Sequence, residues 1–221
     1  MIELDVVSKE FREPNGQVRT LFEDLRLSLG EEDHSLAVCG RSGAGKTTLL
    51  RILAGLDTAF EGRYLFRGQE LGPGAAEMAR YRRQRIGYVT QHVDLLTDRT
   101  VMDNVLMAVP RGRRRGVERR RRAREALASV GLEDYGGRDV RRLSGGEAQR
   151  VAIARAVVGG PELVLADEPT GCLDEGSEAE VLGLFADLRE QGTRFIIATH
   201  SETVAAWCAR RLRIHRHRLQ P

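Results

Sequence analysis

The apolar positions of the chain first follow the two-residue period of β-strands. Apolar and polar residues alternate over 2–7 and 18–29, and Pro14, Asn15 and Gly16 lie between these segments as a turn signal. A two-residue period gathers the apolar side chains on one face of a strand. The start of the chain is therefore predicted to form a small antiparallel β region.

Further along, short apolar runs alternate with segments of helical period. Strands are predicted at 36–39, 63–66, 86–90, 163–166 and 194–199, and helices at 48–54, about 100–158, 177–191 and 202–210. Strands that alternate with helices favour an α/β core with a mostly parallel sheet. Glycines interrupt the long helical stretch, so a block of about 92–158 is expected to be a helical subdomain inserted into a single domain of residues 1–221.

The composition is that of a folded chain. Of the 221 residues, 41% are hydrophobic and 30% are charged, which excludes a disordered or collagen-like protein. No apolar run approaches the roughly 20 residues that span a bilayer, and the acidic, alternating start is unlike a secretory signal. Cys39, Cys172 and Cys208 lack metal-ligand spacing and are expected to be reduced cytosolic thiols.

Arginine supplies nearly all of the basic residues. Of 35 basic residues 33 are arginine, and only Lys9 and Lys46 are lysine. A lysine retained in such a chain is interpreted as a position that needs a compact ammonium group rather than any positive charge.

The arginines cluster in two places and leave the remaining chain acidic. Residues 111–124 hold nine arginines and one glutamate, and residues 210–218 hold five arginines and no acid. The first cluster is read as a solvated helix, as a surface for anionic lipid, or as a nucleic-acid site, and the lack of interleaved aromatic residues disfavours nucleic acid. The same three interpretations apply to the second cluster, in which His215 and His217 are interpreted as a solvated end rather than a metal site.

A glycine-rich segment follows the strand predicted at 36–39. It matches G-x-x-x-x-G-K-[ST], with a strand before it and a helix after it. Its glycines let successive N–H groups face a phosphate, and the helix dipole favours negative charge there. Lys46 is expected to bridge the β- and γ-phosphates of a nucleoside triphosphate, and the Thr47 hydroxyl to bind Mg²⁺. The expected ATP-binding residues here are Gly40, Arg41, Ser42, Gly43, Ala44, Gly45, Lys46, Thr47 and Thr48.

Two acidic residues end the apolar run 163–166. Asp167 is expected to hold Mg²⁺ through water, and Glu168 to orient or deprotonate the attacking water. The alternative is a pair of solvated acids at a strand end, which the phosphate loop (Gly40–Thr47) makes less favourable.

The segment Leu143–Arg150, LSGGEAQR, narrows the class of ATPase. Ser144 and Glu147 fit a capping box, but that motif does not explain the two glycines between them, which weaken a helix. Glycines at a helix start allow a phosphate to approach the backbone closely. With this signature the chain resembles the ATP-binding cassette (ABC) family of P-loop NTPases, and the family's motifs occur in order over essentially the whole length.

The resemblance implies a role for each matching residue. Two such chains are expected to pair head to tail, so that each ATP lies between the phosphate loop of one chain and the signature of the other. The signature residues expected to bind ATP are Ser144, Gly145, Gly146 and Glu147. Phe11 corresponds to the aromatic residue that stacks on adenine, with a core residue as the alternative. Gln91 corresponds to the glutamine that reaches Mg²⁺ and the water, and His200 to the histidine that contacts the γ-phosphate.

Three positions depart from the family's usual residues. The family more often has tyrosine at Phe11, aspartate at Ser201, and asparagine, alanine or serine at Cys172. Leu173-Asp174 still resembles the loop that crosses the dimer interface.

The form of the motifs points to one branch of the family. Residues 165–174 read LADEPTGCLD, which is similar to the ADEPTGxLD form of the branch that holds lipoprotein-release, macrolide-export and cell-division ATPases. This resemblance implies an ATPase subunit, cytoplasmic and peripheral on the inner face of the cell membrane, that powers a separate permease exporting lipoprotein, peptide or drug-like cargo. The alternative is a cell-division type that gates an envelope hydrolase. A DNA-maintenance ATPase is disfavoured because the short stretch between Lys46 and Ser144 has no room for its coiled coil.

Overall fold

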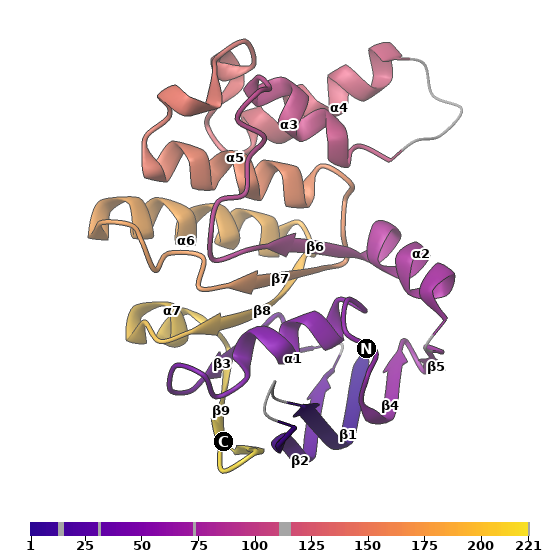
Figure 1. Cartoon of the computed structure of the whole chain (residues 1–221). Helices are drawn as coiled ribbons and strands as arrows, with labels where there is room; N and C mark the ends of the chain where they lie inside the picture. Colours follow the sequence, from indigo (N-terminus) through magenta and orange to yellow (C-terminus); the bar gives the residue numbers. More distant parts are fainter. Residues whose placement is uncertain (13–15, 31, 73, 111–115, 221) are drawn as a thin grey trace. The chain divides into compact units, whose positions relative to one another are not determined.

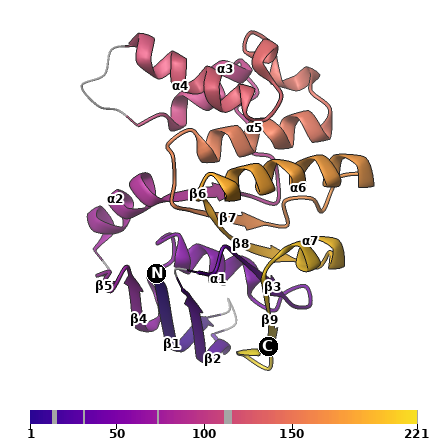
Figure 2. The ribbon, with the colours of Figure 1, turned by 180° about the vertical axis from the view of Figure 1, so that it is seen from behind.

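The computed structural model describes residues 1–12, 16–30, 32–72, 74–110 and 116–220. Its helices and strands are labelled along the ribbon in Figures 1 and 2. The chain divides into two compact units. The first unit consists of Met1–Arg82 and Arg194–Pro221, and the second of Arg83–Thr193. The prediction of one domain with an insertion at about 92–158 stays a prediction.

An antiparallel sheet occupies the N-terminal part of the first unit. Its strands are β1 (Ile2–Arg12), β2 (Val18–Leu29), β4 (Glu61–Phe66) and β5 (Gln69–Glu70), in the order β2-β1-β4-β5. The alternate apolar residues of β1 and β2 are buried, as the two-residue period predicts. Gly62 lies so close to β1 that a Cβ there would overlap the carbonyl oxygen of Asp5, so only glycine fits this crossing.

Parallel strands form the other part of the first unit. The fully buried β3 (Ser35–Cys39) pairs in parallel with β8 (Arg194–Thr199) and with β9 (Arg210–His215), and β10 (Arg218–Gln220) pairs antiparallel with β9. The helices of this unit are α1 (Lys46–Leu53), α7 (Glu202–Trp207) and all of α2 (Ala75–Arg85) except its last three residues. The chain passes directly from β3 through the phosphate loop into α1.

The second unit combines a parallel strand pair with helices. Strands β6 (Ile86–Val89) and β7 (Leu163–Asp167) run in parallel. The helices are α3 (Val101–Ala108), α4 (Gly116–Ala128), α5 (Gly145–Val157) and α6 (Glu175–Glu190), with short 3-10 turns at Glu133–Tyr135 and Val140–Arg142. A Cβ on Gly87 would lie 2.6 Å from the carbonyl oxygen of Ala156, so glycine in β6 lets α5 pack close to the strand.

The predicted α/β class with parallel and antiparallel sheets is confirmed, and one local prediction was wrong. The helix predicted over 202–210 ends at Trp207, and residues 210–218 form β9 and the start of β10, where His215 and His217 are exposed. Helix α2 was not predicted. The turn residues Pro14 and Asn15 and residues 111–115 of the arginine cluster lie outside the described residues. Among the described helices, none is long and apolar enough to cross a membrane.

Candidate nucleotide site

Glycine geometry shapes the phosphate loop. Gly43 and Gly45 have left-handed backbones, with φ of 75° and 104°. A Cβ on Gly45 would lie 2.8 Å from ring carbons of Phe22, a buried residue of β2. Both the backbone angle and the Phe22 ring therefore require glycine at position 45.

The N-terminus of α1 opens into this loop without a side-chain cap. The N-cap is Gly45, which makes no side-chain cap hydrogen bond, and the first turn holds no acidic residue. Lys46 is only 9% exposed, and its Nζ donates to the carbonyl oxygen of Gly40 at 3.0 Å. Thr47 beside it is exposed. An uncapped helix start with a lysine across the loop favours the binding of a phosphate.

The far end of α1 is fixed by side chains that sequence reasoning missed. The hydroxyl of Tyr64 donates to the carbonyl oxygen of Leu53 at 3.0 Å and hydrogen-bonds to the Tyr81 hydroxyl. Burial raises the pKa of Tyr64 well above its ordinary value. Arg82 donates to the carbonyl oxygen of Gly55 at 3.0 Å. These donors satisfy carbonyl groups at the C-terminal end of α1, the helix that begins in the phosphate loop.

A hollow of about 240 Å³ adjoins the phosphate loop within the first unit. Its lining residues are Arg19, Thr20, Leu21, Gly43, Ala44, Ile214, Arg216 and His217. The β9–β10 turn that forms one wall has left-handed residues at Arg216 and His217, and the His217 carbonyl accepts the Glu23 N–H at 3.0 Å. This turn and its strands were not predicted, although Leu212 and Ile214 alternate with polar residues, a pattern that is typical of a strand.

Phe11 and His200 also lie in the first unit. Phe11 is at the end of β1 and is 42% exposed, which excludes the alternative of a core residue. His200 is exposed and follows β8 directly. Ser201, the departure from the family's aspartate, is the N-cap of α7 and accepts from the backbone N–H of Val204 at 3.3 Å. The serine therefore has a structural role that does not require a carboxylate.

The acidic pair lies at the end of β7 in the second unit. Asp167 and Glu168 are 4% and 8% exposed. Glu168 has a φ of 46°, a left-handed conformation that costs a non-glycine residue about 1–2 kcal/mol. Such strain concentrates at functional sites, where it fixes the direction of a side chain. The structure therefore favours a functional role over two solvated acids.

The loop after the acidic pair is bonded within itself and to α6. The Thr170 hydroxyl donates to Glu178 at 2.7 Å, and the Leu173 N–H donates to the carbonyl oxygen of Thr170 at 3.0 Å. Asp174 is the N-cap of α6 and accepts from the N–H of Ser177 at 3.0 Å, and this bond is the main cause of the lowered pKa of Asp174. The loop is thus held at both ends.

The signature segment (Leu143–Arg150) begins α5 with the expected capping box. Ser144 Oγ accepts from the Glu147 N–H at 3.2 Å, and Glu147 accepts from the Ser144 N–H at 2.7 Å. The second bond is the main cause of the lowered pKa of Glu147. A Cβ on Gly146 would lie 2.9 Å from Ser177 Oγ, whereas a Cβ on Gly145 would meet no atom within 4 Å. Packing within the chain therefore explains Gly146 but not Gly145.

Gln91 and the arginines of α4 are the other predicted functional residues in the second unit. Gln91 lies on the surface shortly after β6. On α4, Arg121 pairs with Glu118 and Glu125, and Arg122 pairs with Glu118, so part of the arginine cluster is neutralised on its own helix. The described residues contain no group of three or more histidine, cysteine or acidic side chains that could hold a metal ion.

The predicted site residues therefore fall into two sets. The first unit holds Phe11, the phosphate loop with Thr48, and His200, and the second holds Gln91, Ser144–Glu147, Asp167 and Glu168. The predicted Mg²⁺ ligands Thr47, Gln91 and Asp167 offer a hydroxyl, an amide and a carboxylate oxygen. Hard oxygen donors of this kind suit Mg²⁺.

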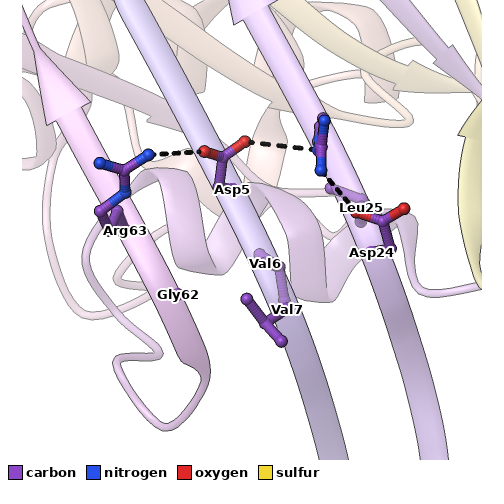
Figure 3. Close-up of a pocket in the computed structure, with 8 residues that line it drawn as sticks. Asp5, Val6, Val7, Asp24, Leu25, Gly62 and Arg63 are labelled. Carbon is purple, nitrogen blue, oxygen red and sulfur yellow. Dashed lines mark hydrogen bonds and ion pairs between the residues drawn. The ribbon is translucent and has the colours of Figure 1, made fainter.

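A second hollow, of about 160 Å³, lies on the antiparallel sheet. Asp5 extends between arginines on the neighbouring strands, as Figure 3 shows for Arg63. Arg26 pairs with both Asp5 and Asp24. The two arginines that line this hollow, Arg26 and Arg63, are already paired with its two carboxylates, and its other lining residues are valine, leucine and glycine.

Comparisons with known proteins agree with this chemistry. Residues 22–171 match the family model described as ABC transporter. The chain is similar to the dimeric structure of MJ0796, a bacterial ABC transporter cassette, with 32% identity, a TM-score of 0.91, and coverage of 100% of this chain and 97% of that one. A post-hydrolysis dimer of MJ0796 bound to ADP and Pi matches at 31% identity with the same coverage and TM-score. The cbiO1 protein from Clostridium perfringens, at 24% identity, a TM-score of 0.87, and coverage of 100% and 86%, shares the fold.

Proposed function

This chain belongs to the ABC transporter family and is an ATPase of that family, and we propose that it powers a separate membrane permease through ATP-driven dimerisation. The observation that carries the proposal is the phosphate loop. Left-handed glycines, the uncapped start of α1 and buried Lys46 together offer backbone N–H groups and one ammonium group to a polyphosphate.

We propose that ATP hydrolysis depends on Glu168, which follows β7, and on His200, which follows β8. Glu168, strained and mostly buried, orients the attacking water or accepts its proton, and His200 contacts the γ-phosphate. Thr47, Gln91 and Asp167 would hold Mg²⁺, which when bound neutralises phosphate charge. Phe11, whose ring is exposed at the end of β1, stacks on adenine.

Dimerisation is supported by the signature helix. Gly145 begins α5 at an exposed position where a side chain would meet nothing in the same chain. A glycine that weakens a helix without a steric reason fits a position that another molecule approaches. We propose that this molecule is ATP bound to the phosphate loop of a second copy, as MJ0796 forms a dimer.

The cargo follows from the branch that the motifs resemble. We propose export of lipoprotein, peptide or drug-like cargo by a permease whose cytoplasmic face this subunit contacts, with gating of an envelope hydrolase as the second candidate. The extracytoplasmic part of the co-purifying membrane subunit distinguishes them, because a large domain there favours export. Contact of the arginine cluster with anionic lipid stays a prediction. Among the arginines of the cluster that the structure describes, Arg121 and Arg122 pair with acidic residues on α4.

The test uses Glu168→Gln, which removes the carboxylate but leaves the phosphate contacts. Size-exclusion chromatography with light scattering should show a monomer without nucleotide and a dimer with ATP in the absence of Mg²⁺, and the variant should not turn over ATP. Lys46→Ala is the matched control and should neither bind ATP nor dimerise. Near wild-type hydrolysis by Glu168→Gln would contradict the role of Glu168, and unchanged ATP affinity of Lys46→Ala would contradict the phosphate site.

A further inference from the structure

The second retained lysine, Lys9, is buried on β1 two residues before Phe11. It is 3% exposed, although lysine is almost never fully buried without a partner. In a chain that otherwise uses arginine, a buried lysine outside the phosphate loop requires a physical reason.

The ammonium group of Lys9 has two oxygen acceptors. Nζ donates to the Asp57 carboxylate at 2.8 Å and to the carbonyl oxygen of Ala59 at 2.7 Å. Both acceptors belong to the loop that follows α1, and the N–H of Asp57 donates to the carbonyl oxygen of Arg51 in that helix at 3.2 Å. The single nitrogen of an ammonium group can donate to both of these closely spaced acceptors at a buried position. The planar guanidinium group of arginine is broader, and its donors do not have this arrangement.

The same nitrogen lies against the Phe11 ring. Nζ is 4.9 Å from the ring centroid, within the range of a cation–π interaction. The pairing register of β1 with β2 shifts between Lys9 and Glu10, so this contact occurs where the strand is irregular. Lys9 thus contacts both the exposed Phe11 ring and the loop that follows α1.

We propose that Lys9 is a positioning residue for the nucleotide base, which holds the Phe11 ring against the adenine and ties that ring to the α1 loop. The inference rests on the proposed function, in which Phe11 stacks on adenine. Without the ammonium group the ring samples other rotamers, and the base loses its ordered partner. The effect should therefore depend on the presence of a base in the ligand and not on its phosphates.

The test compares the binding of ATP with that of inorganic tripolyphosphate, which has no base, in the absence of Mg²⁺. Lys9→Gln keeps a donor for Asp57 and Ala59 but removes the charge. It should weaken ATP binding about fivefold and leave tripolyphosphate binding unchanged. Phe11→Ala should weaken ATP binding at least as much, and adding Lys9→Gln to it should have no further effect, because the ring is already absent.

Steady-state ATPase kinetics of Lys9→Gln and of a control variant, Arg63→Gln, test the same inference. Lys9→Gln should raise the KM for ATP and leave kcat unchanged, the pattern of lost ground-state binding. Arg63→Gln, which removes a cation paired with Asp5 on the same sheet, should behave as wild type. If Lys9→Gln does not fold, Lys9→Met combined with Asp57→Asn removes the cation without leaving a carboxylate unpaired and should show the same ATP-specific loss.

The outcomes separate this inference from the proposed function. Equal losses for both ligands, additive effects of Lys9→Gln and Phe11→Ala, or wild-type ATP affinity of Lys9→Gln would each overturn the positioning role. If the wild-type protein binds both ligands and Lys9→Gln binds them with the same affinities, the inference is refuted but the proposed function is not. A wild-type protein that binds neither ligand refutes the proposed function, and the inference with it.

Discussion

Replacing Gly145 by alanine should separate stability from function. Gly145 is the first residue of α5, directly after the Ser144 N-cap, and its φ is not left-handed. An added Cβ would meet no atom within 4 Å, so the folded chain accommodates the methyl group without displacement. Alanine also restricts the unfolded chain more than glycine does.

The expected gain in stability is about 0.5 kcal/mol, which corresponds to about 1–2 °C in Tm for a chain of this length. ATP-driven dimerisation and hydrolysis should instead fall more than about tenfold, because the methyl group would stand between the α5 backbone and a γ-phosphate. Gly146→Ala should lose activity too but with the opposite change in stability. Its Cβ would lie 2.9 Å from Ser177 Oγ, which donates to Asp174, and moving that hydroxyl should cost about 1–2 kcal/mol.

The assay measures thermal unfolding, steady-state ATPase rate, and the dimer fraction on the Glu168→Gln background for each variant. Gly183→Ala is the matched control, since Gly183 is an exposed glycine of α6 at which a Cβ would also meet nothing within 4 Å. It should gain stability and keep full activity. A Gly145→Ala protein that is stabilised and hydrolyses ATP at the wild-type rate would refute the argument that a second molecule approaches this glycine.

Two further predictions concern Lys46 and Glu147. Lys46→Arg should lose ATP binding almost as fully as Lys46→Ala, because the guanidinium is too broad for a loop in which Nζ lies 3.0 Å from the Gly40 carbonyl oxygen; calorimetric titration that finds wild-type affinity would exclude this. The Ser144 N–H lowers the pKa of Glu147 below its ordinary 4.5, so its contribution to stability is present above that pH and is lost as the pH falls below it. Glu147→Gln keeps the capping box, so its urea midpoint should depend less on pH than that of wild type between about pH 6 and about pH 3, and an identical dependence would contradict the assignment.

The alternation of strands and helices could be read from the sequence where apolar residues set the pattern. Strands β3, β7 and β8 are fully or almost fully buried, and their continuous apolar runs identified them. Strand β9 was missed because its exposed positions hold Arg211, Arg213 and His215, and Ile214 is its only buried residue. Helix α2 was missed for a related reason, since Met78 and Tyr81 are its only buried residues among those described and charged residues surround them.

Local structure at the candidate site could be predicted where a motif fixes the spacing, as in the helix start after the phosphate loop and the capping box of the signature. Supporting contacts could not be predicted, because they join residues far apart in the sequence. Examples are Tyr64 on the Leu53 carbonyl oxygen and Ser177 beside Gly146. Strain at Glu168 was equally invisible, because a backbone angle is a property of the folded loop and not of the residue.

The two lysines have the same physical explanation. Both are buried, and both bring a single nitrogen to about 3 Å or less from a main-chain carbonyl oxygen, Lys46 to Gly40 and Lys9 to Ala59. The arginines of exposed ion pairs, such as Arg121 and Arg141, lie where a broad guanidinium has room. The chain therefore uses lysine instead of arginine at the two buried positions where only an ammonium group fits. In the proposed function one such slot lies at the phosphate end of the nucleotide and the other at its base, so the rarest basic residue of the chain marks both ends of one ligand.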